Sequence, residues 1–224
     1  MNENLKIVRY KDLPQGGFAG IAERHLAKNS QVWPHSNKQI SNGLKDFIYL
    51  STGIFKPNDG APLHPHKDVD IVSFIFSGEI GHKGSLGDGT KIKAPGVQVQ
   101  RAGTGMTHSE FSTTNEEADF AQIWFLPPEN GLKPGYQDFP IEGNKLTTVL
   151  GGDNHTFNSN MICKIGFVEA GSALEIKGDY VAVLFDGSLN IDGIEINKRD
   201  LFEGQDLNLR TTSQIGIILI QNKE

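Results

Sequence analysis

Two histidines separated by one residue, in the tripeptide HPH at 64–66, are the first feature of the sequence that could do chemistry. Side chains at positions i and i+2 of a β-strand point to the same face, so both imidazoles could reach one metal ion. His108 and Glu110 repeat that spacing. We expect two strands facing each other inside a small barrel to bring His64, His66, His108 and Glu110 together. Three neutral imidazoles and one carboxylate suit Fe, Mn, Ni, Cu or Zn and leave one or two octahedral positions open for water, substrate or O₂.

The other histidines have simpler interpretations. A bare HxH pair is more often two unrelated surface histidines than a metal site, and an HxE pair is a weaker signal still. His25, His35 and His155 are interpreted as surface or loop residues. His82 follows a glycine in an expected hairpin and receives the same interpretation, with a pocket-lining role as the alternative. Cys163, within the apolar run MICKIGF, is interpreted as a buried, inert thiol.

Short apolar runs must supply the strands that position these residues. The 224-residue chain holds 26 glycines and 10 prolines, and segments with helical periodicity are almost absent. Many short strands at close spacing predict an all-β sandwich or barrel. Asp-Gly pairs at 88–89, 186–187 and 192–193 favour tight hairpins, because both residues tolerate a positive φ. The expected strands are Asp46–Leu50, Val69–Phe76, Phe120–Leu126, Tyr180–Phe185 and Ile215–Gln221.

A Pro- and Gly-rich stretch, Leu126–Asn144, offers the best boundary between two domains. Pro-Pro and Pro-Gly do not fit a central strand, so the stretch is predicted to be a loop or linker. We predict a metal-binding domain at 1–138 and a second domain at 139–224. The second domain contains neither HxH nor HxE, and its single histidine is His155. Its expected role is structural.

Charge and composition exclude several classes of protein. The formal charge is −6, from 21 basic and 27 acidic residues, and no Lys/Arg-rich stretch is present. Nucleic-acid binding, which usually needs a basic patch, is therefore not expected. No apolar run approaches the roughly 18 residues of a spanning helix, and the first residues lack the apolar core of a secretory signal. One cysteine and no signal predict a cytoplasmic location.

One long segment resembles the metal-binding cupin domain of pirins. It reads HPHKDVDIVSFIFSGEIGHKGSLGDGTKIKAPGVQVQRAGTGMTHSEF and continues through AQIWFLPPENGLKPGYQ, so the likeness spans roughly Leu44 to Gln137. The resemblance implies a bicupin, with two β-barrels face to face and metal in the N-terminal barrel only. The pirin ligand set falls on His64, His66, His108 and Glu110.

Two positions depart from the pirin pattern. Asp70 stands where pirins generally have Glu, four residues after the second histidine. Gln100-Arg101 replaces an aromatic-Met or Met-Ser pair. Asp70 is expected to alter a hydrogen bond to a residue that surrounds the metal ligands. Arg101 is expected to alter the charge of the pocket and the choice of substrate.

The resemblance implies two functions from different classes. Some bacterial pirins resemble quercetin 2,3-dioxygenases, which cleave flavonols with O₂ to a depside and CO. In that reading the metal is Fe(II), with Mn, Ni, Cu or Zn as alternatives, and Glu110 is the general base for the 3-hydroxyl group. Other pirins resemble redox-dependent regulators that bind a transcription factor or a metabolic enzyme. A third reading keeps the metal site but assigns a different substrate, because a cupin fold does not select one reaction.

Overall fold

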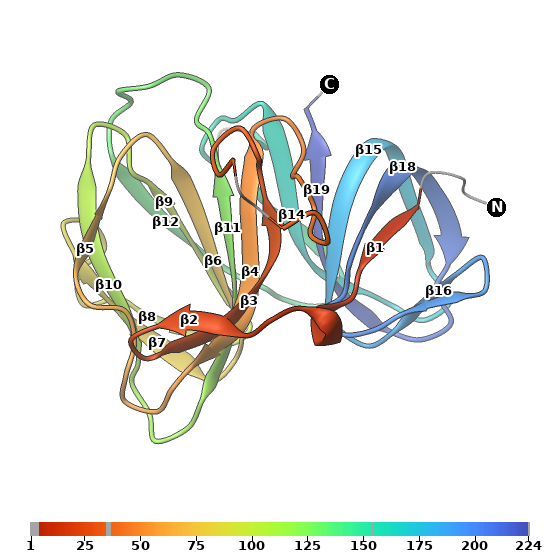
Figure 1. The fold of residues 1–224 in the computed structure, drawn as a ribbon, viewed down its shortest axis with the longest axis horizontal. Coiled ribbons are helices and arrows are strands. Elements are labelled where there is room, and N and C mark those ends of the chain that lie inside the picture. The colour runs from red at the N-terminus through yellow and green to blue at the C-terminus, as the bar shows by residue number, and fades with distance from the viewer. Residues whose placement is uncertain (1–4, 35–36, 154, 224) are drawn as a thin grey trace.

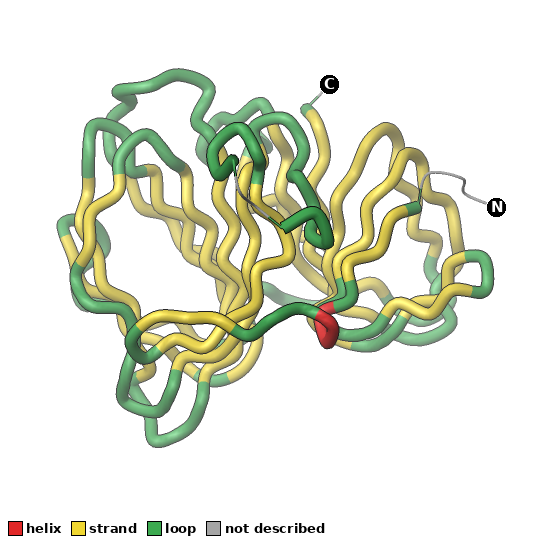
Figure 2. Tube along the Cα trace, viewed as in Figure 1, coloured by secondary structure: helices red, strands yellow, loops and turns green. Residues whose placement is uncertain are grey.

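The computed structural model describes residues 5–34, 37–153 and 155–223. Strands make up almost all of the regular structure, and the one helical element drawn is a short 3-10 turn at Tyr10–Asp12 (Figure 2). Among the residues described, no helix has the length and apolar character needed to cross a membrane. The strands form two barrels that stand side by side (Figure 1).

The first barrel consists of a seven-stranded sheet and a four-stranded sheet. The larger sheet has the order β12-β9-β6-β11-β4-β3-β2, and the smaller has the order β5-β10-β7-β8. The larger sheet contains β2 (Gly16–Phe18), β3 (Ile21–Lys28), β4 (Phe47–Phe55), β6 (Asp70–Ser77), β9 (Gly96–Arg101), β11 (Ala118–Phe125) and β12 (Gly135–Pro140). The smaller contains β5 (His64–His66), β7 (Glu79–Gly84), β8 (Lys91–Lys93) and β10 (Met106–Ser112).

The second barrel is built on a six-stranded sheet with the order β1-β18-β15-β19-β14-β13, together with a ribbon of β16 and β17. Its strands are β1 (Lys6–Val8), β13 (Leu146–Leu150), β14 (Met161–Val168), β15 (Ala173–Asp186), β16 (Leu189–Ile191), β17 (Ile194–Ile196), β18 (Leu201–Arg210) and β19 (Ile215–Asn222). Strand β1, from the start of the chain, pairs with β18 and so lies in the second barrel (Figure 1).

One apolar core joins the two barrels. Alternate residues of the seven-stranded sheet point away from the first barrel and pack against the sheet of the second. Burying these side chains on both sheets stabilises the pair of barrels as one unit, since the area removed from water is shared between them. The shared core includes Val72, Phe74, Val97, Ala121, Ile123, Cys163, Ile165, Val181, Val183, Ile218 and Ile220.

The observed strands confirm the all-β prediction. The five expected runs fall within β4, β6, β11, β15 and β19, with ends that differ by a few residues. Gly89, Gly187, Asp192 and Gly193 all have positive φ angles, as the Asp-Gly turns predict.

The Pro- and Gly-rich stretch differs from expectation because it contains β12. That strand is tolerated there because it lies at the edge of its sheet and Pro140 is its last residue. The chain passes to the second sheet between Pro140 and Leu146. The division at 138/139 stays a prediction.

Candidate metal centre

Antiparallel pairing of β5 with β10 brings three histidines together. His64 lies directly opposite His108, and His66 lies opposite Met106. One ring nitrogen from each histidine falls within a group whose atoms lie within 4.8 Å of one another. The two strands are hydrogen-bonded neighbours in one sheet, whereas two strands facing each other inside a small barrel were expected. The common face of the pleat is what makes the imidazoles converge.

The orientation of the rings fits a metal ion. His64 Nδ1 lies 2.7 Å from the carbonyl oxygen of Pro62, a contact in which the ring donates its proton and leaves Nε2 with a lone pair. His64 Nε2 lies 3.1 Å from His108 Nε2. Two nitrogens bound at about 2.1 Å to one ion, at right angles, lie about 3 Å apart. The spacing is therefore that of two adjacent ligands.

Burial keeps two of these imidazoles neutral in the metal-free protein. Loss of solvation lowers the pKa of His108 to about 3, and the neighbouring His64 and His82 add to the effect. Loss of solvation also lowers the pKa of His66 to about 4; His108 and His64 lower it further, and the charge of Glu110 opposes them. Metal ions bind the neutral imidazole, so these shifts favour coordination at neutral pH.

Glu110, two residues after His108 on β10, accepts hydrogen bonds from two glutamines. Its side chain is buried, and the Gln122 amide donates to Glu110 Oε2 at 3.0 Å. The Gln98 amide donates to Oε1 in a very short contact. These bonds stabilise the carboxylate in a buried setting, where an unpaired charge would be costly. The close group of ring nitrogens consists of the three histidines, and Glu110 as a fourth ligand stays a prediction.

His82 is buried, so its interpretation as a surface residue was wrong. Its Nε2 atom lies 3.0 Å from Gln100 Oε1, and its ring centroid lies 5.6 Å from that of His108. Strand β7 alternates, and His82 shares the inward face with Ile80, which packs in the barrel core. That i, i+2 relation to a buried isoleucine is the signal that could have placed His82 inside.

Of the remaining histidines, His25 and His155 lie outside the three-histidine cluster. His155 is exposed, as expected. His25 is half-buried on β3, where its ring contacts Glu23 Oε1 at 3.1 Å. His35 lies outside the described residues.

The two departures from the pirin pattern are partners in one buried ion pair. Arg101 donates from Nε and Nη2 to the two carboxylate oxygens of Asp70, at 2.9 and 2.6 Å. The same guanidinium donates to the side-chain and backbone oxygens of Asn158, at 2.8 and 2.6 Å, and lies over the ring of Phe157. Burial raises the pKa of Asp70, and the Arg101 charge opposes that rise. The pair ties the barrel that carries the three histidines to the segment before β14.

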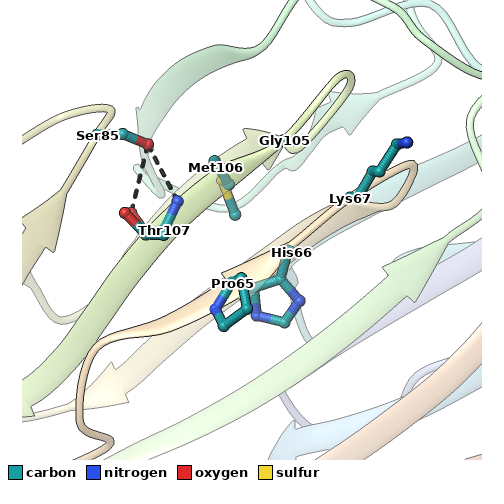
Figure 3. Close-up of a pocket in the computed structure, with 7 residues that line it drawn as sticks. All are labelled: Pro65, His66, Lys67, Ser85, Gly105, Met106 and Thr107. Carbon is teal, nitrogen blue, oxygen red and sulfur yellow. Dashed lines mark hydrogen bonds between the residues drawn. The ribbon is translucent and has the colours of Figure 1, made fainter.

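A cavity of about 530 Å³ reaches the cluster at His66 (Figure 3). Met106 and Thr107 of β10 form one side of this open cavity, and Ser85, which also lines it, is hydrogen-bonded to the Thr107 backbone (Figure 3). Its volume lies in the range of roughly 300–1,000 Å³ that is usual for small-molecule sites. The full lining is Pro65, His66, Lys67, Ser85, Gly105, Met106 and Thr107.

Two fused β-barrels, with three converging histidines in the first, define a bicupin with a candidate metal centre. Solved structures agree on the fold. The bacterial pirin YhhW from Escherichia coli, in complex with nickel(II), matches with a TM-score of 0.84 and 19% identity over 96% of this chain and 97% of that one. Quercetin 2,3-dioxygenase from Acinetobacter baumannii matches with a TM-score of 0.74 and 17% identity, over 100% of this chain and 87% of that one.

Sequence comparison identifies the family. The pirin family model matches residues 30–125. A Zymomonas mobilis protein provisionally named quercetin 2,3-dioxygenase is 34% identical over 172 residues, which are 74% of this chain and 64% of that protein. Quercetin 2,3-dioxygenase of Escherichia coli is 34% identical over 96 residues, 42% of each chain. The matches thus span less than two thirds of either relative. The chain belongs to the pirin family.

Proposed function

We propose that this protein is a metal-dependent dioxygenase that cleaves flavonols such as quercetin with O₂ to a depside and CO, and that its metal is Fe(II). The observation that carries the proposal is a set of converging imidazoles next to a buried carboxylate, with a cavity that reaches one of the histidines. Relatives named quercetin 2,3-dioxygenase support the reaction class. The proposed catalytic domain is residues 1–138, apart from β1, which lies in the second barrel, and residues 139–224 are its proposed support.

Each proposed role follows from the position of the residue. His64, His66 and His108 would hold the ion. Such an ion supplies Lewis acidity toward the flavonol oxygens and a one-electron couple for O₂ chemistry. Glu110 is the proposed fourth ligand and general base, and one of its oxygens accepts the proton of the 3-hydroxyl group.

Gln98 and Gln122 fix the direction of the carboxylate. Their amides each donate to one Glu110 oxygen, so the base is held in place before substrate arrives. A carboxylate held in this way needs little rearrangement to accept a proton.

The test is aerobic quercetin consumption by Fe(II)-loaded protein, followed by loss of visible absorbance and by release of CO. We expect turnover in the wild type and its loss in His64→Ala, which removes a ligand. His155→Ala is the matched control, because that histidine is exposed and is not part of the cluster. Absence of turnover in protein shown by elemental analysis to hold iron would reject the proposal.

The role of Glu110 needs its own variant. Glu110→Gln preserves the size of the side chain and removes its basicity. With iron still bound, we expect turnover to fall by about 100-fold or more, the usual contribution of a general base. Turnover that persists at the wild-type rate would show that the base lies elsewhere.

A further inference from the structure

A chain of aromatic rings runs from the metal centre toward the surface of the first barrel. The ring centroid of His66 lies 5.3 Å from that of Trp124, which lies 4.8 Å from that of Tyr49. Trp33 is the outer member, with centroids 5.8 Å from Tyr49 and 6.2 Å from Trp124. Each ring is thus in contact or near contact with the next, from a candidate metal ligand to the half-exposed indole of Trp33.

The types of ring matter as much as their spacing. Trp and Tyr are the side chains most easily oxidised by one electron among the aromatic residues, whereas phenylalanine is not oxidised under the same conditions. Phenylalanines fill the shared core, including Phe74 and Phe125. Trp124 and Tyr49 are instead paired on β11 and β4, with the Trp124 ring next to His66, and Trp33 comes from the loop after β3.

Tyr49 also has a proton acceptor. Its hydroxyl oxygen lies 3.4 Å from both carboxylate oxygens of Glu23, which also contacts the His25 ring. Burial raises the pKa of Tyr49, and the Glu23 charge raises it further, so the phenol is protonated at neutral pH. Burial opposes ionisation of Glu23, but hydrogen bonds from His25 and its other neighbours hold its pKa below the usual value. An electron can leave Tyr49 while its proton moves to Glu23.

We propose that Trp124, Tyr49 and Trp33 conduct single electrons from the surface to the metal centre, and so protect the histidine ligands when peroxide reacts there. Hydrogen peroxide takes up two electrons and two protons to give two waters. An ion held by the three histidines would supply one electron and pass from the ferrous to the ferric state, and the aromatic chain would supply the other. Both protons come from solvent. Each oxidised ring then takes an electron from the next ring toward the surface, until Trp33 is the oxidised residue and its indole loses a proton to solvent. A soluble reductant such as ascorbate then restores Trp33 by giving one electron and one proton, and ascorbate would also return the ion to its ferrous state.

This inference rests on the metal-binding part of the proposed function and needs no flavonol. Its test is mapping of oxidised residues by mass spectrometry after iron-loaded protein is treated with hydrogen peroxide without ascorbate. In the wild type we expect oxygen to add mainly to Trp33, with His66 and His108 largely intact. Trp124→Phe should reduce Trp33 oxidation by several-fold and raise oxidation of the ligands by a similar factor.

Two further variants distinguish electron transfer through the rings from direct oxidation of an exposed indole by peroxide. In Trp33→Phe the outer end is missing, and we expect the oxidation to appear on Tyr49 and Trp124. Tyr136→Phe is the matched control: Tyr136 contacts the His82 ring on another side of the centre, outside the chain. It should leave the pattern unchanged. Ascorbate should suppress oxidation of Trp33 in the wild type.

The outcomes distinguish this inference from the proposed dioxygenase activity. Trp33 oxidation that is equal in the wild type, Trp124→Phe and iron-free protein would mean that peroxide acts on an exposed indole, and would overturn the inference. Iron content is measured in every sample, and a chain that binds no iron would overturn it too. Quercetin turnover is measured separately, and we expect Trp33→Phe to keep the wild-type rate in a short assay.

Discussion

The two barrels have related folds but fill their interiors with different residues. In the first barrel, His82, Gln98, Gln100, His108 and Glu110 are buried together. The second barrel has a core of apolar side chains, among them Leu184, Ile191, Phe202, Ile217 and Leu219. Burying polar groups costs free energy unless each finds a partner, and the second barrel shows that the fold does not require them. The fold alone therefore does not account for the polar interior of the first barrel.

The largest expected effect is the loss of metal binding when one histidine of the first barrel is removed. We expect His108→Ala to abolish tight metal binding, because it deletes a fully buried ligand from the centre of the cluster. The loss of metal affinity should exceed the roughly 10–100-fold loss that follows removal of a residue that only hydrogen-bonds to a metal ligand. Metal content by elemental analysis after dialysis, together with titration of the metal-free protein, checks this. His155→Ala should bind metal like the wild type, and an unchanged affinity in His108→Ala would place the metal elsewhere.

The next largest effect is a loss of stability when the Asp70–Arg101 ion pair at the junction between the barrels is broken. Asp70→Ala leaves the Arg101 guanidinium buried without its carboxylate, and breaking such a pair costs about 3–5 kcal/mol. We expect the free energy of unfolding in chemical denaturant to fall by that amount.

The double variant Asp70→Leu/Arg101→Met is the control for the ion pair. It replaces both charges by apolar groups and should recover most of the loss, because no unpaired charge remains. A double variant as unstable as Asp70→Ala would show that packing, and not charge, is what the pair contributes.

Part of this comparison could be predicted from the sequence. The HPH spacing on a short strand is visible without a structure, because period-2 alternation sends both rings to one face. The lack of HxH after residue 139 similarly indicates a second barrel without this site. The short apolar runs and Asp-Gly turns gave the all-β class.

The glutamine partners could not be predicted in the same way. Gln98 and Gln122 interrupt apolar runs, and nothing local indicates that they meet Glu110 from two different strands. The ion pair between Asp70 and Arg101 depends on register across β6 and β9, which the sequence does not specify. His82 was misplaced for a related reason, since a glycine before a histidine suggests a turn whether or not the strand continues through it.

A substitution in the apolar interior of the second barrel should lower stability and leave metal affinity unchanged. We expect Leu184→Ala to lower the free energy of unfolding by about 2–5 kcal/mol, because this fully buried leucine leaves a cavity that the barrel fills only in part. Metal affinity should stay at the wild-type value, as the substitution lies outside the first barrel. A drop in both quantities would mean that the two interiors are coupled through the shared core.

The last expected effect is a pH dependence specific to the first barrel. In the metal-free protein, the pKa values of His108 and His66 are lowered to about 3 and about 4. The unfolded chain has ordinary histidine pKa values near 6.5, so between about pH 6.5 and 4 it binds more protons than the folded protein. The free energy of unfolding should therefore fall as the pH falls through this range, by at most about 1.4 kcal/mol per pH unit for each histidine.

The measurement is a series of denaturant titrations of metal-free protein between pH 7 and pH 5, a range chosen to stay above most carboxyl titrations. His108→Gln removes one of the two titrating groups, so its slope should be shallower than that of the wild type. His155→Ala should leave the slope unchanged, because the exposed ring does not share their burial. Equal slopes in the wild type and His108→Gln would show that the buried imidazole is not held neutral, and the electrostatic contrast between the barrels would then rest on Glu110 and its glutamines alone.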